Sequence, residues 1–305
     1  MNDPSTVPFV SIVIPSKNRH STIRECVTAC LNLDYPASRC EILVVDDGSE
    51  PPLPLFQDPR VQLIRQPGLG PAAARTRGLR AASGQFIAFT DDDCRPRPDW
   101  LSRLVGILID EPETLIGGHT RNALSGNLYA ATSQLLIDRL YVGFERRPQE
   151  RFFTSNNLAG AREKFVALGG FDAEFPLAAA EDRDLCDRWR VSGGALHYAP
   201  SAVVDHYHKM SFTDFLRQQH NYGRGARLLS ARRAARHGKF AFQPLNFYFE
   251  LFSELFRSYP AFSAIYMSGL LVFAHIANLA GFIAEGARSK PAVCPGSSAR
   301  DESDR

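Results

Sequence analysis

Phe86-Ile87-Ala88-Phe89-Thr90-Asp91-Asp92-Asp93 is an apolar run that ends abruptly in three carboxylates. The run has the length and composition of a buried β-strand. Three carboxylates crowded at one strand end repel one another unless a cation or solvent offsets their charge. Oxygen ligands favour Mg²⁺ or Mn²⁺, which often complete their coordination with phosphate oxygens. We therefore expect either a metal site or a solvated acidic turn at this edge of a sheet.

Strands and helices alternate before this run. Phe9 to Pro15 and Glu41 to Val45 are apolar and β-branched, and Val61 to Arg65 reads as a shorter strand. Helical patterns lie between the strands, at residues 21–33 and 70–83. This order predicts an α/β fold with a mainly parallel, Rossmann-type sheet flanked by helices.

Polar side chains follow these strands, at the edge where open α/β sheets bind ligands. Asp46 and Asp47 follow the second strand, and Arg75 lies on the helix before the acidic strand. A carboxylate there can accept hydrogen bonds from a base or a ribose, and an arginine can pair with a phosphate in a fork geometry. Together with the acidic triplet, these residues predict a nucleoside diphosphate site.

The composition excludes several classes of protein. Of the 305 residues, 44% are hydrophobic and 22% are charged, which fits neither global disorder nor a polytopic membrane protein. The net charge of +2 gives no general basic character, so we expect no nucleic-acid partner. The six cysteines form no CxxC pair, and we expect reduced thiols. The N-terminus lacks the pattern of a signal peptide, so we expect the chain to begin in the cytoplasm.

With these motifs in order, the chain resembles a family 2 glycosyltransferase with the GT-A nucleotide-sugar-binding fold. The segments that carry the resemblance are 11–19 (SIVIPSKNR), 41–49 (EILVVDDGS), 70–75 (GPAAAR), 86–94 (FIAFTDDDC) and 98–101 (PDWL). They cover the first hundred residues almost continuously. Several ordered motifs at family-like spacing are far more specific than any one of them.

The resemblance implies roles for the donor-binding residues. Asp91 and Asp93 correspond to the DxD carboxylates that bind Mg²⁺ or Mn²⁺, with Asp93 as the metal ligand, Asp91 nearer the ribose and Asp92 between them. Asp46 and Asp47 would flank the base and ribose, with the one that touches the base left open. The loop that contains Pro15, Ser16, Asn18 and Arg19 would wall the base pocket.

In the second half of the chain, Thr154 to Ala159 and Gly169 to Asp172 resemble the segments that line the donor sugar. Glu181 and Asp182 match the acidic motif of the family. An inverting transfer needs a carboxylate to take the proton from the attacking hydroxyl, and we assign this role to Asp182, with Glu181 orienting the acceptor. The alternative is a pair of helix N-terminal acids favoured by the helix dipole. His206 matches the family histidine and would either complete the metal site or be structural.

Departures from the family pattern leave a second interpretation open. Gly68 and Thr76 stand where the family has asparagines, so a non-catalytic, membrane-bound sugar-nucleotide or lipid-binding protein is the alternative. A dinucleotide-dependent oxidoreductase is disfavoured because GxGxxG is missing after the first strand. Arg188-Trp189 lacks the glutamine of the processive QxxRW motif, and we expect one sugar to be transferred per encounter.

The C-terminal part predicts membrane association. Residues 211–240 carry seven Lys or Arg and one acid, an aromatic stretch covers 242–256, and 258–284 contains no charged residue. Basic segments are attracted to anionic lipid by about 1 kcal/mol per residue, and about 20 apolar residues can span a bilayer. We expect peripheral or monotopic attachment, or a single span, at the cytoplasmic face of the cell membrane. The polar positions in 261–284 leave a buried or in-plane helix as the alternative to a crossing.

These expectations define four segments. Residues 1–110 form the nucleotide-sugar-binding half, and 111–225 form the acceptor-binding and catalytic-base half of the same domain. Residues 226–290 are the helical membrane-associating segment, and 291–305 form a disordered tail. The expected acceptor is a glycan or a lipid-linked molecule in cell-envelope or exopolysaccharide synthesis.

Overall fold

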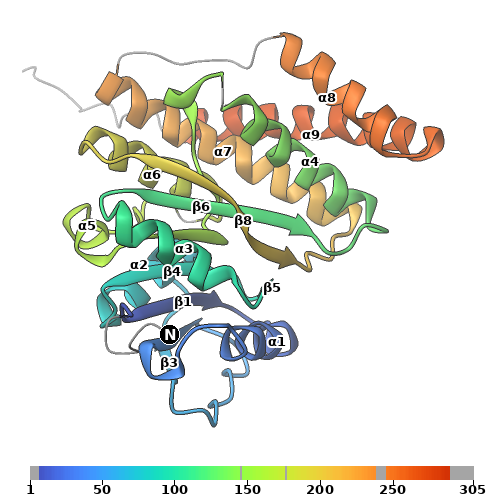
Figure 1. Cartoon of the computed structure of the whole chain (residues 1–305). Helices are drawn as coiled ribbons and strands as arrows, with labels where there is room; N and C mark the ends of the chain where they lie inside the picture. The colour runs from blue at the N-terminus through green and yellow to red at the C-terminus, as the bar shows by residue number, and fades with distance from the viewer. Residues whose placement is uncertain (1–6, 145, 176, 238–244, 289–305) are drawn as a thin grey trace, which may run out of the picture.

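The computed structural model describes residues 7–144, 146–175, 177–237 and 245–288 (Figure 1). The tail expected to be disordered, 291–305, lies outside the described residues. So do Lys239 of the basic stretch and the first residues of the aromatic stretch.

The strands within these ranges are β1 (Val10–Ser16), β2 (Cys40–Asp47), β3 (Val61–Gln66), β4 (Phe86–Thr90), β5 (Cys94–Pro96), β6 (Leu115–Asn122), β7 (Asn157–Ala161) and β8 (Leu196–His206). They form one sheet in the order β3-β2-β1-β4-β7-β6-β8-β5. β3, β2, β1 and β4 run parallel to one another, as expected, and β6 is parallel to β8. β7 runs antiparallel to both β4 and β6 and so joins the two halves of the sheet.

The helices are α1 (His20–Leu31), α2 (Pro71–Ala81), α3 (Trp100–Asp110), α4 (Leu128–Gly143), α5 (Arg162–Ala167), α6 (Glu181–Val191), α7 (Phe212–His237), α8 (Leu245–Ser258) and α9 (Ala261–Arg288), with short 3₁₀ turns at Ala37–Arg39 and Pro148–Glu150. Successive side chains of a strand point to opposite faces of the sheet. Ile12 and Ile14 of β1 therefore pack in one core with Trp100 of α3, whereas Val13 packs in the other with Leu79 of α2. The two apolar cores confirm the helix-covered α/β sheet.

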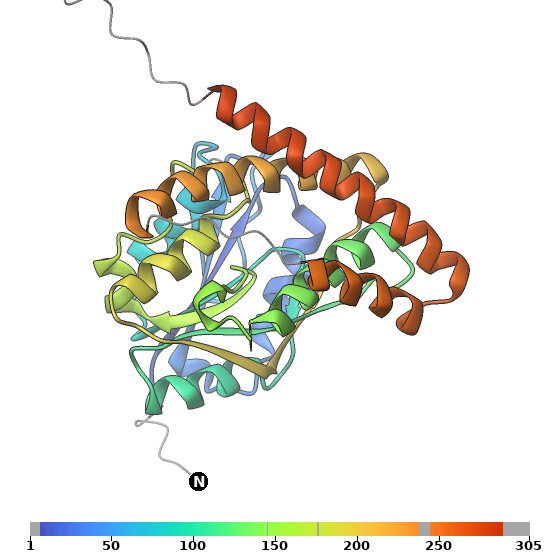
Figure 2. The same ribbon diagram turned by 90° about the horizontal axis from the view of Figure 1, so that it is seen from above.

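A layer of helices, α4, α7, α8 and α9, covers the β6–β8 end of the sheet (Figure 1). α9 lies along α7, as the view from above shows (Figure 2). The expected boundary between residues 225 and 226 falls inside α7, which runs without a break across it. By length and composition, α9 is the one helix among the described residues that is suited to cross a membrane.

The two faces of α9 differ sharply. One face contributes Ala264, Met267 and Leu271 to a buried cluster with α4 and α8. The other face carries what we call the apolar stripe, made up of exposed side chains that share one side of the helix: Phe262, Ile265, Tyr266, Val272, Phe273, Ile276, Leu279 and Ile283.

Candidate active site

A cavity of about 340 Å³ opens at the carboxyl ends of β1, β2 and β4, as expected for an open α/β sheet. Pro15, Ser16, Asp47 and the acidic triplet line one side. The N-terminus of α6 and His206, at the end of β8, complete this part of its wall. The structure thus brings most of the predicted donor, metal and base residues into one cavity.

Asp93 is the most strongly charge-stabilised carboxylate in the cavity. His206 Nε2 lies 3.2 Å from Asp93 Oδ1, and Arg19 Nη1 lies 2.5 Å from Asp93 Oδ2. Burial opposes ionisation, but the hydrogen bond and charge of His206, together with Arg19, hold the pKa of Asp93 well below its usual range. In turn, the hydrogen bond to Asp93 outweighs burial and raises the pKa of His206.

The donor atoms around Asp93 fit a divalent cation. One ligand atom each from Asp93, Cys94 and His206 lies within 4.8 Å of the others. Burial raises the pKa of the Cys94 thiol well above its usual range, so it remains a neutral and poor ligand. The carboxylate of Asp93 is an oxygen ligand of the kind that suits Mn²⁺ or Mg²⁺. His206 can ligate a metal only through a neutral imidazole.

Asp92 is largely buried beside the end of β1. Its Oδ2 accepts a hydrogen bond of 2.7 Å from Ser16 Oγ, and Arg19 lies 3.5 Å from its Oδ1. Burial raises the pKa of Asp92 to about 7 despite these contacts. Asp92 therefore joins the β1 loop to the acidic triplet.

Arg75 binds carboxylates of the protein and also lines the cavity, and the expectation that its fork meets a phosphate stays a prediction. Nη2 donates to Asp91 Oδ1 at 2.7 Å, and Nη1 donates to Glu181 Oε1 at 3.0 Å. The Arg75 side chain is only 3% exposed, so the pair of bonds is shielded from solvent. Arg75 fixes the DxD strand end against α6.

Glu181 and Asp182 begin α6 but differ in surroundings. Glu181 is buried against Arg75, and burial, followed by the charge of Asp182, raises its pKa to about 7. Asp182 is partly exposed and lines the cavity, and its Oδ1 accepts a hydrogen bond of 2.7 Å from the Arg183 amide. Burial also raises the pKa of Asp182. Of the two acids, Asp182 is the one whose carboxylate is free to meet a substrate.

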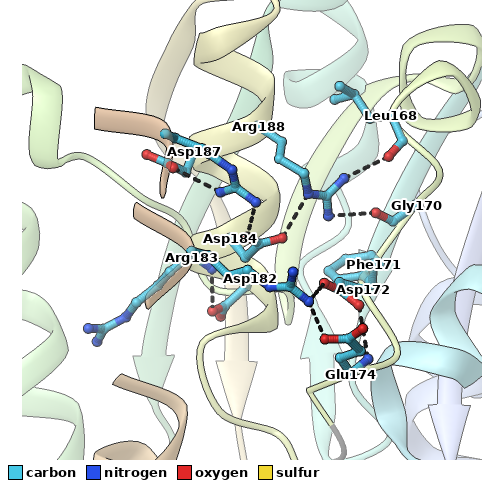
Figure 3. A network of polar contacts seen from close by, with 12 residues as sticks. Leu168, Gly170, Phe171, Asp172, Glu174, Asp182, Arg183, Asp184, Asp187 and Arg188 are labelled. Atoms are coloured by element: carbon cyan, nitrogen blue, oxygen red, sulfur yellow. Dashed lines mark hydrogen bonds and ion pairs between the residues drawn. The ribbon is translucent and has the colours of Figure 1, made fainter. Parts of the chain in front are cut away.

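Ion pairs hold α6 in place behind these two acids (Figure 3). Asp184 is fully buried and accepts from Arg188 Nε and from Arg236 Nη2, both at 2.7 Å. Arg236 also pairs with Asp187 at 3.0 Å. One turn earlier in α7, Arg232 pairs with Asp172. The basic residues of α7 were expected to attract lipid, but at these positions they bind acids of the protein instead.

Two of the predicted donor ligands do not line the cavity. Asp46 is fully buried, and its oxygens accept from the amides of Ser49 at 2.8 Å and Leu53 at 3.2 Å. Asn18 accepts from the Glu50 amide at 2.8 Å. Both residues shape loops, and neither lines the cavity. Asp47 does line it, although its carboxylate accepts from the amides of residues 69 and 70.

Thr76, one of the two departures from the family pattern, has a clear structural role. Its hydroxyl accepts from the Phe171 amide at 2.9 Å and donates to the Phe171 carbonyl at 3.1 Å. The threonine thus holds the segment before α6 against α2. The change from the family asparagine to Thr76 is therefore compatible with a functional donor site.

Part of the cavity wall was not predicted from the sequence. It comes from the end of β6 (Thr120, Asn122), from α4 (Ala130, Ser133, Gln134, Ile137) and from α7 (Gln218, Tyr222). The strand-end rule would have identified the β6 residues had β6 been recognised. The helical residues carry no local motif. Thr154, Ser155 and Asn156 line the cavity as the resemblance implied.

The family model described as "Glycosyl transferase family 2" matches residues 11–169, about half of the chain. The chain belongs to glycosyl transferase family 2. Family members similar to it include a pre-mycofactocin glycosyltransferase of Mycobacterium tuberculosis, 31% identical over 73% of this chain and 48% of that protein. AglE of Haloferax volcanii is 29% identical over 72% of this chain and 74% of that protein. The chain spans about half the length of the mycobacterial relative.

Solved structures of glycosyltransferases share the fold. The mannosyltransferase PcManGT of Pyrobaculum calidifontis, solved with GDP-Man and Mn²⁺, superposes with a TM-score of 0.63 over 94% of this chain and 90% of that one, at 18% identity. GalNAc-T7, solved with UDP, GalNAc and Mn²⁺, gives a TM-score of 0.52 over 72% of this chain and 48% of that one, at 17% identity. These likenesses confirm the GT-A fold of this family 2 member.

Proposed function

We propose that this protein is an inverting, metal-dependent glycosyltransferase that moves one sugar from a nucleotide-diphosphate sugar to an acceptor hydroxyl. The observation that carries the proposal is the placement of Asp182 in the same cavity as Asp91 and Asp93. Among the described residues, no side chain forms an ion pair with Asp182, whereas both DxD carboxylates are held by arginines. The cavity thus combines a free carboxylate with a fixed acidic pair.

The donor would bind along the strand ends. Pro15, Ser16 and Asp47 would surround the nucleoside, and Asp93 and His206 would hold Mg²⁺ or Mn²⁺. When bound, such a cation offsets the charge of the departing diphosphate. Support comes from the donor set at Asp93 and from the nucleotide sugar and Mn²⁺ bound to the structural relative PcManGT.

Asp182 would act as the general base. Its carboxylate takes the proton from the acceptor hydroxyl as the oxygen forms a bond to the anomeric carbon, and the bond from that carbon to the diphosphate breaks on the opposite face. Burial raises the pKa of Asp182, which makes the ionised carboxylate a stronger base. Glu181 has a positioning role in this scheme because it is buried against Arg75.

Transfer of one sugar per encounter is supported by the positions of Arg188 and Trp189. Arg188 donates to the carbonyls of Leu168 and Gly170, both at 2.8 Å. Trp189 is fully buried in the apolar core. Neither residue lines the cavity, so the pair has a structural role rather than that of the processive motif.

We also propose that α9 attaches the protein to a membrane in the plane of the bilayer surface. The apolar stripe faces outward, while the opposite face packs against α7 and carries the ion pair of Glu285 with Arg224, at 2.7 Å. A crossing helix would have to leave these contacts. The cytoplasmic face, a glycan or lipid-linked acceptor and a role in envelope or exopolysaccharide synthesis complete the proposal.

Nucleotide release from UDP-, GDP- and dTDP-sugars, with Mn²⁺ or Mg²⁺, tests the enzymatic proposal. We expect metal-dependent release from one donor, loss of donor binding in Asp93→Ala, and a rate reduced about 10²- to 10⁴-fold with retained donor binding in Asp182→Asn. Asp58→Asn, a carboxyl outside the cavity, is the control. Donor binding by the wild type without turnover in the presence of any acceptor tested would favour the non-catalytic alternative.

A further inference from the structure

The wall of the cavity that α4 and α7 supply differs in chemistry from the donor side. Its lining side chains are Ala130, Ser133, Gln134 and Ile137 of α4 and Gln218 and Tyr222 of α7. None of them is charged. The cations that line the cavity belong to other elements, and they include Arg19 beside Asp93 and Arg75 between Asp91 and Glu181.

Gln218 and Tyr222 are one helical turn apart and therefore lie on the same face of α7. Gln218 Oε1 accepts a hydrogen bond of 2.7 Å from Ser133 Oγ, which fixes the amide across the gap between the two helices. Within the described residues, nothing accepts a hydrogen bond from Gln218 Nε2. A fixed amide with a free donor group is suited to bind an oxygen in the cavity.

Tyr222 lies beside the proposed base. Burial raises the pKa of its hydroxyl, and the charge of Asp182 raises it further, so the group stays protonated. No described residue forms a hydrogen bond with this hydroxyl, although the side chain reaches the cavity. A protonated phenol at this position can donate to a substrate oxygen that is held next to Asp182.

We propose that Gln218 and Tyr222 bind the acceptor and that the group they recognise is the uncharged hydroxyl array of a sugar rather than a phosphate. This inference rests on the proposed transferase function and specifies its acceptor. The Asp182 carboxylate repels an anion, and the α4–α7 wall offers no cation to offset that repulsion. Arg183 of α6 also lines the cavity, and its guanidinium lies 4.0 Å from the centre of the Phe152 ring. Neutral donors and acceptors match sugar hydroxyls.

The experiment measures nucleotide release from the preferred donor in the presence of neutral p-nitrophenyl glycosides or of farnesyl phosphate. We expect at least one glycoside to stimulate release and farnesyl phosphate to have no effect. In Gln218→Ala and Tyr222→Phe, the KM for that glycoside should rise about five- to tenfold relative to the KM for the donor, as expected for loss of one hydrogen bond. Arg217→Ala, whose side chain is 69% exposed on the same helix, is the matched control and should change neither KM.

Each contrary result points to a different error. Stimulation by farnesyl phosphate and by none of the glycosides overturns the acceptor class. An unchanged ratio of the two KM values in both variants overturns the assignment of Gln218 and Tyr222. Donor binding is measured separately by calorimetry. Failure of the wild type to bind any nucleotide sugar contradicts the proposed function itself, and the inference with it.

Discussion

Glu181 and Asp182 show how neighbouring acids acquire different tasks from their surroundings. Glu181 is 2% exposed and bonded to Arg75, while Asp182 faces the cavity and is held by backbone amides. Carboxylates in different environments acquire different pKa values and therefore different roles. The acid with the free carboxylate is the candidate base, and the enclosed acid fixes Arg75 and, through it, Asp91.

The buried state of Glu181 predicts a pH-dependent effect on stability. Its pKa is about 7 in the folded protein against an ordinary value of 4.5, so the folded state keeps a proton that the unfolded chain releases between these pH values. The contribution of this proton to the free energy of unfolding is fully present below pH 4.5 and is lost as the pH rises through 7. Glu181→Gln removes the dependence, so the free energy of unfolding of the variant relative to wild type should increase by more than about 1 kcal/mol from pH 4.5 to pH 8. Urea unfolding of both proteins at several pH values measures this change. A difference in the free energy of unfolding that stays constant with pH would contradict the prediction.

The sequence alone could not show which of two consecutive acids, Asp46 or Asp47, reaches the cavity. Asp46 and Asp47 end the same strand, and successive side chains of a strand point to opposite sides. The motif identifies the pair, but only the surrounding loops show that Asp46 is enclosed and that Asp47 reaches the cavity. Likewise, the sequence identified Arg75 but not its carboxylate partner on α6, more than one hundred residues later.

Among the elements, β1, β2 and β4 were predictable from their continuous apolar runs and α2 from its Ala- and Arg-rich composition, whereas β6 was missed. Gly117 and Gly118 interrupt the apolar pattern of β6. A Cβ at these positions would lie 2.0 Å from the Phe153 ring and 2.3 Å from the Asn157 amide oxygen, so close packing dictates the glycines. The sequence signal for this strand is weak because tertiary contacts select its residues.

The crossing of α7 and α9 depends on the same kind of close approach. A Cβ added to Gly223 would lie 1.8 Å from the Asn278 carbonyl oxygen, and one added to Gly281 would lie 1.9 Å from that of His220. Gly223→Ala should therefore push the helices apart and lower the free energy of unfolding by about 1–3 kcal/mol. Gly269→Ala on α9, where a Cβ meets nothing within 4 Å, should instead stabilise by about 0.5–1 kcal/mol through helix propensity. Denaturant unfolding measures the change in the free energy of unfolding for each variant. Equal changes in the two variants would argue against this close helix packing.

In the whole molecule, the C-terminal helices connect the cavity to the apolar stripe. α7 supplies Gln218 and Tyr222 to the cavity on one side and packs against α9 on the other. Ion pairs from Arg236 to Asp184 and Asp187 also join α7 to the helix that carries Asp182. If α9 binds a membrane, only one layer of packed helices would separate the membrane surface from the cavity. This arrangement is consistent with an acceptor that is located at a membrane.

The apolar stripe allows this arrangement to be tested on the intact chain. Val272, Ile276 and Leu279 are 54–60% exposed, so their replacement by Asp together should leave the core intact. Because the apolar surface that lipid would cover is replaced by charge, binding to vesicles of phosphatidylcholine and phosphatidylglycerol should fall by more than tenfold in cosedimentation. The control replaces Leu55, Ile109 and Val191 by Asp, which adds the same charge at exposed apolar positions away from α9. Equal loss in both triple variants would attribute the effect to net charge, and no loss in either would remove α9 as the attachment surface. Selective loss in the stripe variant, with unchanged thermal unfolding and unchanged nucleotide release from a soluble donor, would show that α9 anchors the protein without forming part of the catalytic cavity.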